Sequence, residues 1–426
     1  MDIYLLYARK IPTKVMSTFK YVKLLNIVSY IFLIVLISLA TGSFIPDFFV
    51  VILFFFLFYL LISKKEIISY FKNKLIFFLL LFYLYINLRS LFTENVLFSL
   101  KHSFLFIRFI ALGLVSYLIF YKRKKINSIF FYSTAAILIF VLLDSYFQFF
   151  FERNLLGLKS LNPARITGIF NDRYILGSFL SKFYLFFLIF LFLSKETKYR
   201  DLFFYIGNVL VIIMIFLTGE RASFFFAVVS ILFLFFLLDI KKRKTILICS
   251  FLMLVLLLAL IDLKELYQRM FLNPFQAMYS GSLFSEQHTY HYQTAFNMFK
   301  ENIFFGQGTR MFRFLCDKSI FKVHDLGCAT HPHNYYAQFM AELGIVGLLF
   351  LISFYVLIIS KLLKHFYGQL FYKKYYYKNY EVVVLIYYFC LFFPFIPNAD
   401  FFNNWILIFI FIPFGFLVSI LNKSRV

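Results

Sequence analysis

The stretch CATHPHNYYAQFMAELGIVG, residues 328–347, places two histidines just before an apolar run that continues to Ser360. A helix that crosses a membrane needs about 20 mostly apolar residues, and blocks of this kind recur along the whole 426-residue chain. The composition, 62% hydrophobic and 15% charged, lies far outside the range of soluble domains. The sequence therefore predicts an all-α polytopic membrane protein.

Clusters of lysine and arginine separate the apolar blocks. Each cluster follows an even number of spans in a chain of about twelve predicted spans, which is the positive-inside pattern. We therefore expect one integral membrane domain, residues 1–426, with both termini in the cytoplasm. The polar interval 264–334 then becomes one long loop with short helices on the opposite, periplasmic face. Because the formal charge of +23 is divided among these clusters, no nucleic-acid partner is expected.

Two of the four cysteines, Cys316 and Cys328, lie in this long outer loop. In an oxidising compartment we expect them to form a disulfide. Closing a loop of about thirteen residues would stabilise the loop by about 3 kcal/mol in the chain-entropy model. The alternative is a zinc site that combines the two cysteines with His331 and His333.

Five of the seven histidines lie in the same loop, and His331 and His333 stand out by position. We interpret His288, His291 and His324, each taken alone, as solvated polar residues. Pro332 suits the first turn of a helix, so we expect the His331 and His333 pair at the outer mouth of the next span. The positive end of a helix dipole favours neutral imidazole, the form that can act as a general base. The sequence does not choose between the two.

Arginines form the second set of candidates. The hairpin LTGERASFF, residues 217–225, leaves Glu220 and Arg221 at the outer membrane edge, and Arg165 and Arg173 are expected at the same level. A single arginine there would simply extend to water. Several cations at one depth instead predict an anionic ligand, because guanidinium matches phosphate oxygens two at a time. A lipid-linked phosphate or pyrophosphate is the expected ligand.

Three segments carry a resemblance to a known family. They are GIFNDRYILGSFL at 168–180, LTGERASFF at 217–225, and NMFKENIFFGQGTRMF at 297–312, which leads into HPHNYYAQFMAELGIVG at 331–347. In this order they resemble the O-antigen ligase and polymerase superfamily of bacterial inner-membrane glycosyltransferases. The likeness is most specific where His333-Asn334 is followed, after nine residues, by Gly-x-x-Gly, with Glu342 just before it. By motif it covers residues 165–350.

The resemblance implies a metal-independent, inverting transfer that needs no cofactor. A glycan would move from undecaprenyl pyrophosphate to an acceptor sugar hydroxyl at the periplasmic face of the inner membrane. The acceptor would be the lipid A core for a ligase, or a second lipid-linked repeat unit for a polymerase. Membrane lipids would surround the spans.

The resemblance also assigns roles to residues. His333, or else His331, would be the base, and Arg221 would bind the pyrophosphate, with Arg173 in the matching upstream segment. Arg165 joins this set because it is expected at the same level of the membrane. Relatives carry an arginine where this chain has His288, so the second loop cation would be His288, Arg269, Arg310 or Arg313. Asn334, Glu342 and Glu220 would support these groups.

Two readings compete with the ligase. A polymerase would use the same site for a different acceptor. A lipid-linked glycan flippase would suit about twelve spans with Arg108 and Lys182 inside predicted spans, although related halves or broken helices, which are common in transporters, are not visible in the sequence. A scaffold protein would not need paired histidines and several arginines at one depth.

Overall fold

The structure is a computed structural model that describes residues 19–63, 72–122, 126–162, 165–194, 200–240, 248, 264–279 and 284–423. The described residues form helices and connecting segments without any β-strand. The helices of the first half are α2 (Phe19–Ser38), α3 (Phe44–Ser63), α4 (Lys74–Ser90), α5 (Val96–Leu105), α6 (Ile107–Lys122), α7 (Asn127–Phe151), α8 (Leu176–Leu193), α9 (Arg200–Leu217) and α10 (Arg221–Leu237).

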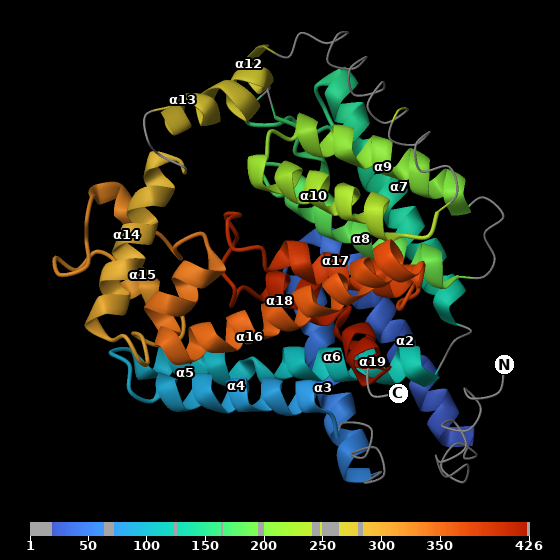
Figure 1. Ribbon diagram of the computed structural model, residues 1–426, viewed down its shortest axis with the longest axis horizontal. Coiled ribbons are helices and arrows are strands. Elements are labelled where there is room, and N and C mark those ends of the chain that lie inside the picture. The colour runs from blue at the N-terminus through green and yellow to red at the C-terminus, as the bar shows by residue number, and fades with distance from the viewer. Residues whose placement is uncertain are drawn as a thin grey trace.

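The second half contains short helices before the last spans. They are α12 (Lys264–Tyr267), a π-helical turn (Gln268–Leu272), α13 (Asn273–Tyr279), α14 (Glu286–Glu301) and α15 (Phe312–Leu315), followed by α16 (Tyr335–Tyr372), α17 (Asn379–Leu391), α18 (Asn404–Phe411) and α19 (Phe414–Lys423). Figure 1 shows α14 and α15 gathered at one end of the bundle, with α12 and α13 running toward them from the ends of α9 and α10. We call this end of the molecule the α14 end.

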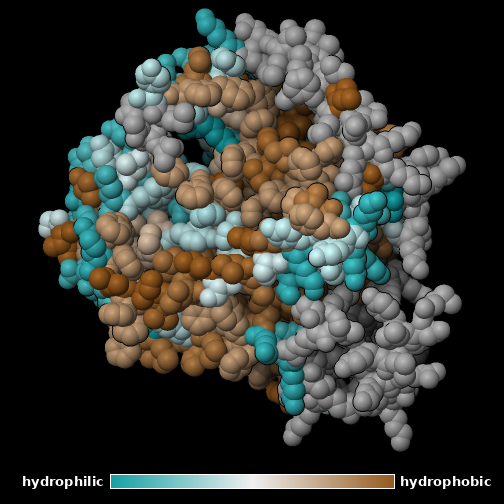
Figure 2. Space-filling view, in the orientation of Figure 1, coloured by the Kyte–Doolittle hydropathy of each residue, from teal (hydrophilic) through white to brown (hydrophobic). Residues whose placement is uncertain are grey.

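Eight helical stretches in the described part of the chain are long and apolar enough to cross a membrane. The apolar helices α10 and α17 are shorter. The prediction of an all-α polytopic membrane protein is therefore confirmed. The count of about twelve stays a prediction, since the expected span near residues 249–263 lies outside the described residues. Figure 2 shows hydrophobic side chains over α4, α5 and α16 and hydrophilic ones around the α14 end.

The core lies between α8, α17 and the pair α18 and α19. The window Leu176–Leu193 is 83% buried, whereas the window Phe44–Ser63 is only 28% buried. Apolarity does not explain this difference, because the peripheral window is the more hydrophobic of the two. The helix α8 carries Ser178, Ser181 and Lys182, and polar residues of this kind pack against other helices in a membrane. The peripheral helices keep apolar residues on their outer faces, as expected for contact with lipid.

A proline break in the core has its hydrogen bonds replaced by tyrosine hydroxyls. Pro413 separates α18 from α19 and has no N–H to donate to the carbonyl of Phe409. The Tyr387 hydroxyl donates to that carbonyl at 2.8 Å, and Tyr388 donates to the next one, Ile410 O, at 2.7 Å. Satisfying backbone groups in this way is what allows a broken helix in a membrane.

A second break, at Gly344 in α16, brings the loop after α14 against the helix. Gly344 has φ 62, and a Cβ there would lie 2.4 Å from the Phe304 carbonyl oxygen. At this break, backbone hydrogen bonds join the loop to α16, from Gly308 N to Glu342 O at 2.7 Å and from Ile345 N to Ile303 O at 2.8 Å. The first glycine of the Gly-x-x-Gly motif is therefore needed for a close backbone approach.

Candidate active site

The segment that carries His333 is fixed by the start of α16. Asn334 is the N-cap residue, and its side-chain oxygen accepts hydrogen bonds from Tyr336 N at 2.8 Å and Ala337 N at 3.1 Å. Its amide nitrogen donates to Pro394 O at 2.6 Å, which ties the segment to the α17–α18 connection. Pro332 lies before the helix, so the expectation that it occupies the first turn was wrong.

His333 itself has a left-handed backbone, with φ 56, and its carbonyl accepts a hydrogen bond from Asn398 N at 2.7 Å. Such a conformation is uncommon for residues other than glycine and persists where the surroundings determine it. The turn directs the imidazole toward α14 and away from the axis of α16. There it meets rings from two parts of the chain.

Four histidines form a cluster, although only two were expected to act together. The His333 ring centroid lies 4.1 Å from that of His331, 5.2 Å from His291 and 5.4 Å from His288. The interpretation of His291 as a solvated residue was wrong, because its side chain is fully buried, with both ring nitrogens lacking a hydrogen-bond partner among the described residues. His324 is exposed and stacks on Tyr290, as expected for a surface residue.

The structure separates the roles available to His331 and His333. His331 has both ring nitrogens engaged, Nδ1 with Thr330 Oγ1 at 2.9 Å and Nε2 with Asn398 O at 3.3 Å. His333 is only half-buried and makes no side-chain hydrogen bond within the described part of the chain. A general base needs a free nitrogen that can reach the substrate, and His333 has one.

The electrostatics of the cluster keep its imidazoles neutral. Burial, together with His331, His288 and His291, lowers the pKa of His333 to about 3. Burial also lowers the pKa values of His331 and His291. Neutral imidazole is the proton-accepting form, so His333 is unprotonated throughout the physiological range, and a pKa this far below neutral makes it a weak base in the unliganded site.

A group of three arginines surrounds the 217–221 turn between α9 and α10. Arg269 Nε donates to Gly219 O at 2.9 Å, and Arg165 Nε donates to Thr218 O at 3.0 Å. Arg221 is the first residue of α10, and its guanidinium repels that of Arg269. Burial and the Arg269 guanidinium lower the pKa of Arg165. We call Arg165, Arg221 and Arg269 the arginine group.

The arginine group makes no ion pair with a carboxylate among the residues that the structure describes. Glu220, the nearest acid in sequence, accepts hydrogen bonds from Gly177 N at 2.7 Å, Ser178 N at 2.9 Å and Ser223 Oγ at 2.9 Å, and so caps the start of α8. The Arg165 guanidinium stacks instead on the Tyr174 ring at 3.7 Å. Positive charge therefore accumulates where a phosphate group could neutralise it.

His288 connects the two sets of residues. Its ring lies 5.4 Å from that of His333, and burial, His291 and the Arg221 guanidinium lower its pKa. This lowered pKa favours neutral His288, so His288 is not the second cation of the loop that was one of the expected alternatives. Arg269, another of those alternatives, supplies positive charge at the arginine group. The exposed Arg173 makes no side-chain contact with that group in the described structure.

Two predicted site residues, Arg310 and Glu342, lie in a separate network. Arg310 Nη2 pairs with Asp400 at 2.9 Å, and Arg313 pairs with the same oxygen at 3.2 Å. Glu342, fully buried, accepts hydrogen bonds from Arg310 N at 3.0 Å and Phe312 N at 3.2 Å. Gln338 bridges Glu342 and Asp400 at 3.1 and 2.8 Å. We call these five residues the Asp400 network.

Asp400 and Gln338 were missed by the sequence analysis. Asp400 is 5% exposed and stands in a segment, PNADFFNNW, that the sequence identified only as an outer loop. A single aspartate in a loop has no spacing that would reveal its partners. The signal in the sequence was the excess of arginines over acidic residues in the outer segments, which indicates that the few acids there pair with arginine.

The remaining polar predictions are also placed. Cys316 and Cys328 form a disulfide with Cα atoms 5.0 Å apart, which rules out the alternative zinc site with these ligands. No group of side chains suited to hold a metal is found in the described part of the chain. Arg108 pairs with Asp47 at 2.9 Å, and Lys182 donates to Ser178 Oγ at 2.7 Å. Both intramembrane cations thus have local partners.

Comparison with known families agrees with this geometry. A family model described as O-Antigen ligase matches residues 206–352. The matched segment starts in α9, contains the turn of the arginine group and all four clustered histidines, and ends in α16. No curated protein is significantly similar to the chain.

Proposed function

The chain belongs to the O-antigen ligase and polymerase superfamily, and we propose that it transfers a glycan from undecaprenyl pyrophosphate to a sugar hydroxyl of the lipid A core. The reaction takes place at the α14 end, on the periplasmic face of the bacterial inner membrane, and both chain termini lie in the cytoplasm. His333 is the base, and the arginine group binds the pyrophosphate.

The observation that carries this proposal is the contrast in ring environments within the histidine cluster. Of the two histidines His331 and His333, His333 is the one with free ring nitrogens. Its backbone is held in place by Asn334 on one side and by Asn398 on the other. A base held in a fixed position can contribute a rate factor of about 10²–10⁴. His331 orients its neighbour through a ring contact of 4.1 Å and has no free nitrogen of its own.

The chemistry follows from these positions. The acceptor hydroxyl gives its proton to a His333 nitrogen while its oxygen attacks the anomeric carbon. The bond from that carbon to the pyrophosphate oxygen breaks, and its electron pair leaves with undecaprenyl pyrophosphate. The guanidinium groups of Arg221, Arg269 and Arg165 stabilise the charge that develops there, and attack opposite the leaving group inverts the anomeric centre. His333 then releases its proton to solvent.

The family includes enzymes with a different acceptor, and the experiment must distinguish them. Purified full-length protein in proteoliposomes is given a glycan on undecaprenyl pyrophosphate and either lipid A core or a second lipid-linked repeat unit. We expect product on the core with the unmodified protein. Growth of the chain on the lipid carrier instead would identify a polymerase that uses the same base.

The histidine assignment is tested in the same assay. His333→Ala should lower transfer by about 10²–10⁴, whereas His324→Ala, which removes an exposed histidine of the same outer segment, should leave it within about twofold. Correct insertion of both variants is checked by the Cys316–Cys328 disulfide on non-reducing gels. Normal transfer by His333→Ala would overturn the base assignment, and no transfer to either acceptor by the unmodified protein would overturn the proposed reaction.

A further inference from the structure

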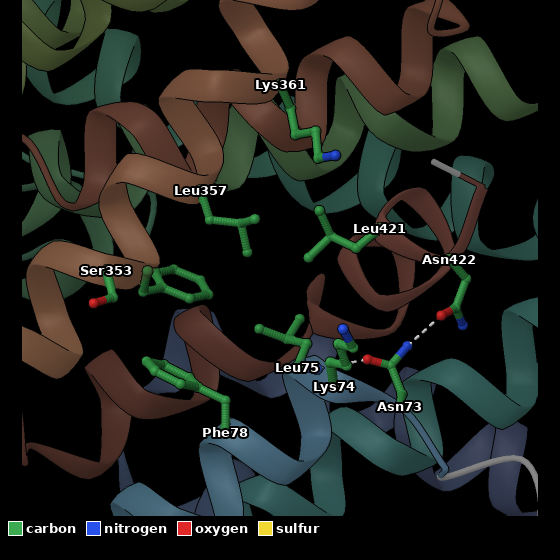
Figure 3. A pocket seen from close by; sticks show the side chains of 10 residues that line it. Asn73, Lys74, Leu75, Phe78, Ser353, Leu357, Lys361, Leu421 and Asn422 are labelled. Atoms are coloured by element: carbon green, nitrogen blue, oxygen red, sulfur yellow. Dashed lines mark hydrogen bonds between the residues drawn. The ribbon is translucent and has the colours of Figure 1, made fainter. Parts of the chain in front are cut away.

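A cavity lies far from the site described above. It has a volume of about 370 Å³, is lined by residues of α4, α16 and α19, and is partly open to the surface. Figure 3 shows Lys361 reaching toward it from α16, with Leu357 and Leu421 on its walls. From the break at Gly344 to Lys361, α16 continues for roughly 25 Å at 1.5 Å per residue. This stretch alone covers most of the hydrocarbon core of a bilayer, which is about 30 Å thick, so the cavity lies toward the opposite membrane surface from His333.

The rim of the cavity is basic. Lys74 begins α4 and Lys361 lies in α16, and both line the cavity. Neither lysine forms an ion pair or hydrogen bond with a described residue. The side chains of Asn73 and Asn422, which also line it, are joined by a hydrogen bond (Figure 3), and so α4 is fastened to α19 at this point. Two positive charges thus line one partly open cavity without a described counter-ion.

The interior of the cavity is apolar and extends toward the middle of the bundle. Leu75, Phe78 and Phe354 line both this cavity and a second one of about 70 Å³. The second cavity is lined by apolar side chains and reaches Phe82 and Phe401. A free inorganic anion would make no favourable contacts with these apolar walls. A ligand that fits both parts carries a negative group at one end and a hydrocarbon chain at the other.

We propose that this cavity binds the phosphate headgroup of an anionic phospholipid between Lys74 and Lys361, with an acyl chain along Phe78, Leu357 and Phe354. Because the cavity lies at a membrane surface, phospholipids are the amphiphilic molecules that surround it. Basic pockets between membrane helices favour anionic headgroups, and each lysine near the surface contributes about a fivefold gain in affinity. The inference is independent of the proposed transferase activity.

The test compares lipids that differ only in headgroup charge. Purified full-length protein is titrated with phosphatidylglycerol or phosphatidylcholine of identical acyl chains, and bound lipid is counted by native mass spectrometry. We expect phosphatidylglycerol to bind about tenfold more tightly or better, and Lys74→Gln with Lys361→Gln to remove the preference. The matched control, Lys72→Gln with Lys364→Gln, removes the same charge from neighbouring lysines that do not line the cavity. An equal loss in both pairs would overturn the proposal.

The apolar part of the site has its own variant. Leu357→Trp fills the cavity and leaves both lysines in place, so it should weaken phosphatidylglycerol binding at least tenfold, whereas Leu363→Trp, on the exposed side of the same helix, should not. Inorganic phosphate is added as a competitor. Displacement of the lipid by millimolar phosphate, or full lipid binding by Leu357→Trp, would show an anion site without a lipid component and would overturn the proposal.

Discussion

Two neighbouring regions at the α14 end differ in whether their charged side chains form ion pairs. In the Asp400 network, Arg310 and Arg313 share one buried carboxylate, and Glu342 accepts hydrogen bonds from the backbone of the adjoining loop. The arginine group and the four histidines form no direct ion pair with a carboxylate among the described residues, although Glu220 acts on Arg165 and Asp400 on His331 through space. Unpaired charges and unsatisfied rings cost stability, and proteins retain them where a ligand completes the arrangement. The difference supports our proposal that the substrate binds the second region, whereas the first serves as scaffold.

The strongest test of this distinction separates His333 from His331. His333→Ala should lower kcat/KM by about 10²–10⁴, because the proton acceptor is removed. His331→Ala should cost about tenfold or less, since it removes only a neighbour that positions the base. The measurement is steady-state transfer in proteoliposomes at saturating acceptor. A larger loss for His331→Ala would move the base to His331 and invert our reading of the two rings.

The arginines provide the next test. Arg221→Ala and Arg269→Ala should each lower kcat/KM for the donor by about 10- to 100-fold, because each removes charge from the developing pyrophosphate. Lysine at either position should restore part of the loss, since it keeps the charge without the planar fork. The control is Arg313→Ala, which leaves the pair between Arg310 and Asp400 intact and should stay within about fivefold. Equal losses at Arg313 and Arg221 would erase the distinction between the two regions.

Removing the carboxylate of the Asp400 network should affect folding and leave donor binding intact. Asp400→Asn leaves two arginines without their counter-ion, and breaking a buried pair costs about 3–5 kcal/mol. Arg310 is 14% and Arg313 24% exposed at the side chain, so we expect a smaller loss of about 2 kcal/mol after allowing for solvent screening. Thermal unfolding in detergent measures it. A normal unfolding temperature with lost donor binding would place Asp400 in the site.

Much of this arrangement could be predicted from local sequence. Apolar blocks and the basic residues between them are local signals, so the helical membrane class follows directly. The positions of His333, Arg221 and Asn334 next to spans also placed them at one end. The cysteine pair lay in one loop, close enough in sequence to meet.

The remaining features depend on contacts between distant segments. His291 enters the cluster only because α14 packs against the start of α16, and Asp400 meets Arg310 across ninety positions of chain. The break at Gly344 follows from the approach of residues 303–308. No periodicity in the sequence encodes such pairings. The difference between His331 and His333 rests on two hydrogen bonds of the His331 ring, to Thr330 Oγ1 and to the carbonyl of Asn398.

The smallest expected effect is in the pH dependence of the reaction. His333 has a pKa of about 3 in the folded protein against about 6.5 for an unperturbed histidine, so it stays neutral from pH 5 to pH 8. We expect kcat/KM to lack an acid limb from the base over that range. Asp400→Asn should not change this, because burial and the neighbouring histidines lower the pKa of His333 without that carboxylate.

The same lowered pKa predicts an effect on stability. The neutral form is favoured by folding, so the contribution of His333 is fully present above about pH 6.5 and decreases as the pH falls toward about 3, because the unfolded chain then binds the extra proton. The slope is below about 1.4 kcal/mol per pH unit, since the ring is only half-buried. Unfolding temperatures measured from pH 7 to pH 5 should fall less steeply for His333→Gln than for the unmodified protein, with His324→Gln as control. The prediction would be contradicted by an acid limb near pH 6.5 in kcat/KM together with equal slopes of unfolding temperature against pH for His333→Gln and the unmodified protein. Both results would show that His333 titrates as it does in solvent, and the assignment of the histidine cluster to the substrate-binding region would then be wrong.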